Sequence, residues 1–182
     1  HMFYGKNSEE PLFKLRKMIH SKTLAERKSA LDELFPHVKH DVKGTMAAMD
    51  GYPVTFRTLD PPLHEFVPTR VDEREKLASS LGISLDELNK RADSLHENNP
   101  MMGHRGVRLG ITYPEISEMQ IRAIFEATAE LLQEGKKPFP EIMIPVTCHV
   151  NEINHQYEIV TKVHAEVCAK FGLKKIPHLT GT

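Results

Sequence analysis

The chain has 182 residues, a length that suits one domain, and its 40% hydrophobic and 27% charged residues are ordinary for a soluble globular protein. A formal net charge of −1 excludes an overall field that would recruit nucleic acid or a membrane surface. No apolar run approaches the ~20 residues of a membrane span, and no secretory signal is visible. We therefore expect a cytoplasmic protein without nucleic-acid or membrane partners.

Helical patterns occupy the beginning of the chain. Apolar periodicity predicts helices over residues 6–19 and 23–35, with Pro36 ending the second, and another helix over residues 37–49. The β-branched and aromatic run over residues 54–60 then predicts a strand, which two prolines terminate.

Residues 63–98 are predicted to form a helical excursion from the strand–helix pattern. A charged helix is expected over residues 69–81. Ser84 and Glu87 have the spacing of a capping box, which predicts the start of a second helix that runs toward His96.

The stretch from residue 99 to 115 combines three glycines with Arg105 and Arg108. Alternating apolar residues predict a short strand over residues 107–112, and Pro114 suits the first position of the next helix. Two guanidinium groups beside glycine-rich backbone fit the recognition of a phosphate or carboxylate. The alternative is that both arginines belong to a solvated face or to structural ion pairs.

The rest of the chain repeats strands and helices. An amphipathic helix is predicted over residues 114–134 with Gly135 after its end, and a buried strand over residues 141–147. Asn151 is expected to cap a final helix over residues 152–171. Strand–helix repeats of this kind predict an α/β fold with a parallel sheet and right-handed crossovers.

Polar side chains come late in each predicted strand, at Arg57 and Asp60, at Arg108 and Thr112, and at Thr147. In parallel α/β barrels the site lies at the carboxyl ends of the strands. We therefore expect Arg57, Arg105 and Arg108 to converge on one anionic ligand.

The cysteines and histidines do not predict a metal site. Cys148 and Cys168 lie twenty residues apart without a CxxC motif, and we expect them to be buried, reduced thiols. The 11 histidines include no HExxH motif. Two histidine pairs are the nearest approach to metal-ligand spacing: His37 with His40, and His149 with His155.

Three segments, taken together, resemble a known family. VTFRTLDPPLHEF (residues 54–66), ENNPMMGHRGVRLGITYPE (residues 97–115) and PEIMIPVT (residues 140–147) are similar to the phosphoenolpyruvate (PEP)/pyruvate-binding domain of the pyruvate, phosphate dikinase family. The likeness covers essentially the whole chain in register. LDPPLHEF with its helical excursion favours this family over the related PEP synthases and the phosphotransferase enzyme I, which stay as alternatives.

The resemblance implies a partial (β/α)8 TIM-type barrel, with residues 1–182 forming about its first half and residues 63–98 the excursion. The complete enzyme would be a transferase that converts ATP, phosphate and pyruvate into AMP, diphosphate and PEP. The barrel would move a phosphoryl group between a phosphohistidine, carried by another domain of the full-length chain, and pyruvate. Arg57 and Arg105 would be its catalytic, substrate-binding arginines, and Arg108 a weaker candidate for substrate binding. A homo-oligomer is also implied.

The resemblance implies Mg²⁺ as cofactor, but it places the metal-binding carboxylates and a proton-donating cysteine beyond Thr182. Neither Cys148 nor Cys168 matches that cysteine. The chain is therefore expected to be a fragment that is inactive on its own. Two other readings remain open: a module that binds PEP or another anion weakly, and a helical interaction protein without a ligand site.

Overall fold

The structure is a computed structural model that describes residues 9–95, 99 and 103–182, apart from the side chains of residues 63 and 64. The fold is mixed α/β, mostly helical, with a small parallel sheet. It consists of two compact units, one formed by residues 1–34 and 61–104 and the other by residues 35–60 and 105–182. Among the described helices, none combines the length and apolar character needed to cross a bilayer.

The first unit is helical. It contains α1 (Glu9–Ile19), the beginning of α2 (Leu24–Ala48), a 3-10 turn η1 (Leu63–Phe66), α3 (Val71–Leu81) and α4 (Leu85–Ser94). The helices predicted around residues 6–19, 69–81 and 84–96 are confirmed over the residues described.

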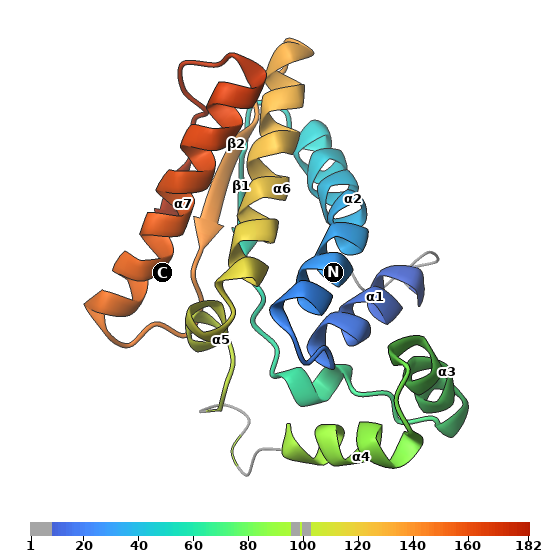
Figure 1. Cartoon of the computed structure of the whole chain (residues 1–182). Coiled ribbons are helices and arrows are strands. Elements are labelled where there is room, and N and C mark those ends of the chain that lie inside the picture. Colours follow the sequence, from blue (N-terminus) through green and yellow to red (C-terminus); the bar gives the residue numbers. More distant parts are fainter. Residues whose placement is uncertain (1–8, 96–98, 100–102) are drawn as a thin grey trace. The chain divides into compact units, whose positions relative to one another are not determined.

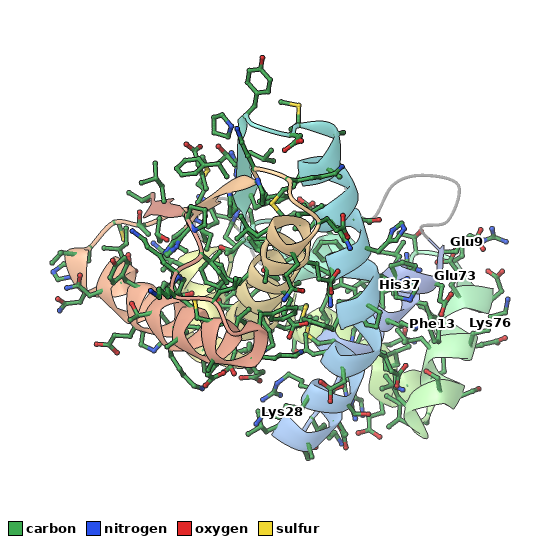
Figure 2. The ribbon with its side chains drawn as sticks, turned by 90° about the horizontal axis from the view of Figure 1, so that it is seen from above. Glu9, Phe13, Lys28, His37, Glu73 and Lys76 are labelled. Carbon is green, nitrogen blue, oxygen red and sulfur yellow. The ribbon has the colours of Figure 1, made fainter. Side chains whose placement is uncertain are left out.

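A small apolar cluster joins α1, α3 and α4. Leu77 of α3 and Leu88 of α4 are fully buried, and Phe13 of α1 packs against them. Figure 2 shows Phe13 close to the turn of α3 that carries Glu73, where α1 and α3 are in contact. An ion pair of 2.8 Å between Arg16 Nη1 and Glu73 Oε2 adds a polar contact between these two helices.

The second unit contains the sheet. Strands β1 (Pro53–Arg57), β2 (Phe139–Met143) and β3 (Leu179–Gly181) lie in the order β1-β2-β3, and both pairs are parallel. Thr55 lies opposite Glu141 in the register. The predicted parallel sheet is thus confirmed, although β1 and β2 begin one or two residues, and end three or four residues, before the predicted strands.

Three helices complete the second unit with the later part of α2: α5 (Val107–Thr112), α6 (Pro114–Gln133) and α7 (Val150–Phe171). Figure 1 shows α6 and α7 side by side along the strands. The amphipathic pattern of α6 explains its position, because most of its side chains are buried. Gly135 follows α6 at φ 81°, as its predicted place after the helix end requires.

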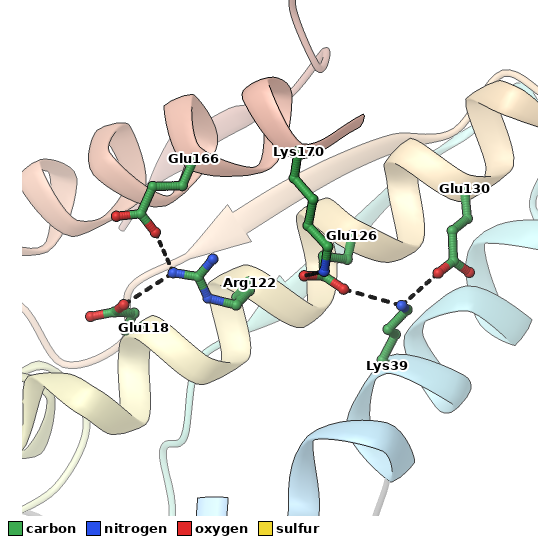
Figure 3. A network of polar contacts seen from close by, with 7 residues as sticks. All are labelled: Lys39, Glu118, Arg122, Glu126, Glu130, Glu166 and Lys170. Carbon is green, nitrogen blue, oxygen red and sulfur yellow. Dashed lines mark hydrogen bonds and ion pairs between the residues drawn. The ribbon is translucent and has the colours of Figure 1, made fainter. Parts of the chain in front are cut away.

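Charged side chains connect the helices of this unit (Figure 3). Glu126 of α6 is 3% exposed, and its carboxylate pairs with Lys39 of α2 at 3.1 Å and with Lys170 of α7 at 2.6 Å. Arg122 of α6 pairs with Glu118 in the same helix and reaches Glu166 of α7. A carboxylate buried as deeply as that of Glu126 needs such partners, because burying an unpaired charge is costly.

The predicted helix break at Pro36 is wrong. Helix α2 runs without interruption from Leu24 to Ala48 and contains Pro36 in its interior. Proline removes one N–H donor and costs roughly 3 kcal/mol in a helix. Buried side chains on both sides of it, such as Leu34 and Val38, continue one apolar face and offset that cost.

The predicted strand over residues 107–112 is also wrong, because these residues form helix α5. Val107 and Gly110, three residues apart, are buried on one face, whereas Ile111 is 37% exposed. The alternation of apolar residues resembled a strand, but burial follows the helical period.

Two predicted helix starts differ in detail from the structure. His149, and not Asn151, is the N-cap of α7, and it forms a capping box with Glu152. At α4 the Ser84 side chain accepts a hydrogen bond from the Glu87 N–H, as predicted. The Glu87 carboxylate, the other half of the predicted capping box, pairs with Lys22 and with Arg91.

Candidate anion-binding site at the carboxyl ends of the strands

The predicted arginines all lie in the second unit. Arg57 is the last residue of β1, and Asp60 lies three residues further on. Arg105 directly precedes the turn into α5, and Arg108 lies within that helix. Parallel strands place their carboxyl ends at one edge of a sheet, which is where ligands bind in α/β folds.

Asp60 joins Arg57 and Arg105. Its Oδ2 accepts a hydrogen bond of 3.0 Å from Nη1 of Arg57, and its Oδ1 accepts one of 3.0 Å from Nη2 of Arg105. Nε of Arg105 also donates to the main-chain oxygen of Asp60 at 3.0 Å. Asp60 and Arg105 are largely buried, with 15% and 14% of their side chains exposed, whereas the Arg57 side chain is 58% exposed. The structure thus brings two of the three predicted arginines together.

The segment that carries Asp60 is held by main-chain hydrogen bonds. The N–H of Thr58 donates to the Met143 carbonyl at 3.0 Å, one residue past the end of β1. The N–H of Leu59 donates to Oε1 of Gln120, a buried amide on α6, at 2.9 Å. Sequence reasoning missed Gln120. Its signal is a polar residue on the apolar stripe of α6 that contains Ile116 and Ala123.

The turn before α5 is shaped by Gly106. Its φ of 57° and ψ of −131° lie outside the conformations of ordinary residues. The next N–H, from Val107, donates to the Pro145 carbonyl at 3.0 Å, so the loop after β2 is in direct contact with this turn. Val146 in that loop has φ 60°, which is rare for a β-branched residue. Gly106 directly follows Arg105, and Val146 lies against Gly106.

Arg108 does not share the contact with Asp60. Its Nη2 lies 3.6 Å from Sγ of Cys148, which lies in the loop between β2 and α7. Glu152 lies nearby, and the N–H groups of Cys148 and His149 donate to it and lower its pKa, with a smaller contribution from the charge of Arg108. The expected convergence of all three arginines is therefore seen only for Arg57 and Arg105.

The cysteines differ from the prediction in one respect. Both are free thiols, and Cys168 is buried as expected, but Cys148 is exposed. Cys148 lies in the loop before α7, outside the core, and its N–H donates to the Glu152 carboxylate. Within the described residues, no group of three or more His, Cys, Asp or Glu side chains is arranged to hold a metal ion.

Comparison with known proteins identifies the family. A family profile described as the PEP-binding domain of PEP-utilising enzymes matches residues 9–181. The chain belongs to this family. The resemblance inferred from the three motifs is therefore confirmed, and it covers nearly every residue of the chain.

Relatives in this family include several pyruvate, phosphate dikinases. The enzyme of Clostridium symbiosum is 46% identical over 173 residues, which cover 94% of this chain and 20% of that protein. The enzyme of Entamoeba histolytica is 48% identical over 184 residues, 97% of this chain and 21% of that protein. The chloroplastic enzyme of Flaveria trinervia is 46% identical over 175 residues, 95% and 18% respectively. The chain spans about a fifth of the length of these relatives.

Proposed function

We propose that this chain forms part of the PEP/pyruvate-binding barrel of a pyruvate, phosphate dikinase. In the complete enzyme a phosphoryl group would pass between a phosphohistidine on another domain and the enolate oxygen of pyruvate. The net reaction would convert ATP, phosphate and pyruvate into AMP, diphosphate and PEP. The observation that carries the proposal is the joining of Arg57 and Arg105 through Asp60 at the end of β1.

Two guanidinium groups held together suit this chemistry. Phosphoryl transfer spreads negative charge over the equatorial oxygens, and catalysis consists mainly of positioning and electrostatic stabilisation. Guanidinium forks bind phosphate oxygens in a fixed, charge-assisted geometry. In this proposal Arg57 and Arg105 hold the phosphoryl group and the enolate oxygen, and Arg108 has a weaker share in binding.

The sheet also supports a barrel. Strands β1, β2 and β3 are parallel and follow one another in the sheet, with α6 before β2 and α7 before β3, the alternation from which a (β/α)8 barrel is built. We propose that the strands of this chain form the first part of such a barrel. In the described sheet β1 and β3 each have one neighbour, and unpaired edges of this kind favour association, including the homo-oligomer that the family likeness implies.

Binding of PEP tests this proposal. Titration calorimetry with the 182-residue chain is expected to show saturable PEP binding that Arg105→Ala weakens by roughly 10- to 100-fold, the effect of losing a charge-assisted hydrogen bond. Arg105→Lys keeps the charge but loses the guanidinium fork, so its affinity for PEP is expected to lie between those of the parent chain and Arg105→Ala. Arg70→Ala is a matched control, because Arg70 is exposed and pairs with Asp72 in the first unit.

The comparison with pyruvate sharpens this test. Since the arginines are proposed to bind the phosphoryl group, pyruvate is expected to bind much more weakly than PEP. Absence of PEP binding, or equal affinity in the parent chain and Arg105→Ala, would contradict the proposal. Binding of inorganic phosphate as tight as that of PEP would instead favour a general anion-binding module.

The described residues near the arginine pair do not fit the Mg²⁺ site that the family's chemistry requires. Both carboxylate oxygens of Asp60 accept hydrogen bonds from guanidinium groups, and no metal-binding group of side chains is found in the described residues. Magnesium prefers nearly octahedral oxygen ligation with one or two carboxylates. We propose that the metal ligands come from residues outside this chain.

Exchange of the methyl protons of pyruvate tests whether this chain lacks part of the site. Enolisation needs stabilisation of the developing negative charge and a group that moves the proton. The 182-residue chain, incubated with pyruvate and Mg²⁺ in deuterated water, is expected to exchange no faster than buffer when followed by proton NMR. Clear exchange that Arg105→Ala abolishes would show that this chain carries a complete site.

A further inference from the structure

We infer that Asp60 is a positioning residue that sets the separation and orientation of Arg57 and Arg105 for the ligand. This inference rests on the proposed function and deepens it. Each carboxylate oxygen of Asp60 accepts from a different guanidinium, at 3.0 Å in both cases. A single planar group therefore fixes the distance between the two cations.

Arg105 is held most firmly. Its Nε donates to the main-chain oxygen of Asp60 and its Nη2 donates to the side chain of the same residue. These two bonds fix both the place and the plane of the guanidinium, since they act on two of its nitrogens. Arg57 has one bond to Asp60 and is much more exposed, so it keeps the freedom to adjust to a ligand.

The main chain just before Asp60 is itself held in place. The preceding N–H groups, of Leu59 and Thr58, donate to the buried Gln120 amide on α6 and to the Met143 carbonyl at the end of β2. Neighbouring elements on two sides therefore define where the Asp60 carboxylate lies. A positioning group needs such rigid support, because loosely held residues do not preserve the geometry of a site.

Removing the charge of Asp60 distinguishes a positioning role from a purely electrostatic one, because the two roles predict opposite changes in PEP affinity. A carboxylate between two guanidinium groups opposes the binding of an anion, so its removal makes the site more positive. If its charge were its main effect, Asp60→Asn would bind PEP more tightly. If Asp60 positions the arginines, Asp60→Asn binds PEP more weakly, because the amide N–H₂ group then faces one guanidinium donor.

Side-chain NMR combined with titration provides the test. The guanidinium ¹⁵N–¹H resonances of Arg57 and Arg105 are recorded in the ligand-free 182-residue chain, followed by titration with PEP. In Asp60→Asn we expect both sets of resonances to shift, faster rotation of the Arg105 guanidinium, and PEP affinity lowered by roughly tenfold, as for one charge-assisted hydrogen bond lost. Glu158→Gln, at an exposed site on α7, makes the same change in charge as a control.

Each outcome decides one claim. Unchanged arginine resonances in Asp60→Asn overturn the inference, and so does PEP affinity that is equal to or higher than that of the parent chain. Backbone amide spectra show whether the variant keeps its fold, and Asp60→Glu, which retains both acceptor oxygens, is expected to recover part of the affinity if the fold is intact. If the parent chain itself shows no saturable shift with PEP, the proposed function fails and the inference falls with it.

Discussion

Replacement of Gly106 by alanine is expected to lower the free energy of unfolding of the second unit by about 3 kcal/mol. Two effects contribute. The φ of 57° with ψ −131° is a conformation that residues with a Cβ rarely adopt. A Cβ at this position would also lie 2.8 Å from the Pro145 carbonyl oxygen and 3.0 Å from Cγ2 of Val146. Backbone atoms cannot move aside as the end of a flexible side chain can, so the loop after β2 would have to shift.

Two other glycines separate these contributions. Gly51 has φ 84° but no heavy atom near its Cβ position, so Gly51→Ala is expected to cost only about 1 kcal/mol for the conformation. Gly44 lies exposed within α2 with open space and no positive φ, so Gly44→Ala is expected to gain up to about 1 kcal/mol. Urea unfolding of the three variants provides the comparison. A loss for Gly106→Ala no larger than that for Gly51→Ala would show that the contact with Pro145 is not a constraint.

The position of Gly106 also predicts a functional consequence of the same substitution. Gly106 follows Arg105 directly, and the turn that it forms directs the chain from Arg105 into α5. A shift of this turn would move the Arg105 guanidinium away from Asp60. The conformation of one residue thus links the fold of the loop after β2 to the geometry of the arginine pair.

Local patterns predicted the elements whose side chains alone decide their structure. The apolar period of residues 114–134 predicted α6, which buries most of its side chains. The β-branched and aromatic run after residue 53 predicted β1, in which half-buried and exposed side chains alternate. The rule that ligands bind at the carboxyl ends of parallel strands placed Arg57 correctly, whereas Arg105 lies on no strand and joins it through Asp60 from the turn before α5. These parts of the fold and site could be read from the sequence.

The errors arose where contacts between distant segments decide the structure. At the start of the helix over residues 107–112, the Val107 N–H donates to the Pro145 carbonyl, a partner nearly forty positions away that no local pattern shows. The part of α2 after Pro36 stays helical because Val38 and Val42 are buried. Asp60 was recognised only as a polar residue at the end of the predicted strand, since its bond to Arg105 spans 45 positions.

The first unit is expected to lose stability as the pH falls from 6.5 toward 4, because of His20. This residue follows α1, is 3% exposed, and has no hydrogen-bond partner for either ring nitrogen among the described residues. Burial and the nearby guanidinium groups of Arg91, Arg16 and Arg74 lower the pKa of His20 from 6.5 to about 4. Desolvation and neighbouring positive charge both disfavour the protonated ring.

The sign follows from proton uptake in the two states. Between pH 6.5 and pH 4 the unfolded chain binds a proton at His20 that the folded chain does not, so unfolding is favoured progressively as the pH falls. The contribution to stability is complete above pH 6.5, and about 3 kcal/mol is lost by pH 4, at 1.36 kcal/mol for each pH unit. Glu87, which pairs with Arg91, has its pKa lowered to about 2 by Lys22 and Arg91, so it stays ionised throughout this range.

A variant isolates this effect from other titrating groups. His178 in the second unit also has its pKa lowered by burial, so the unfolding of the parent chain reports both histidines. His20→Leu places an apolar side chain in the buried position and removes the group that titrates there. The difference in unfolding free energy between the parent chain and His20→Leu is therefore expected to change by up to about 3 kcal/mol between pH 7 and pH 4.

His40→Gln, on an exposed part of α2, is expected to leave that pH dependence unchanged. NMR of the ring C–H protons gives the titration midpoint of His20 directly. A midpoint near pH 6.5 would mean that burial does not disfavour the charged ring of His20. The pH dependence of stability would then have to come from other groups.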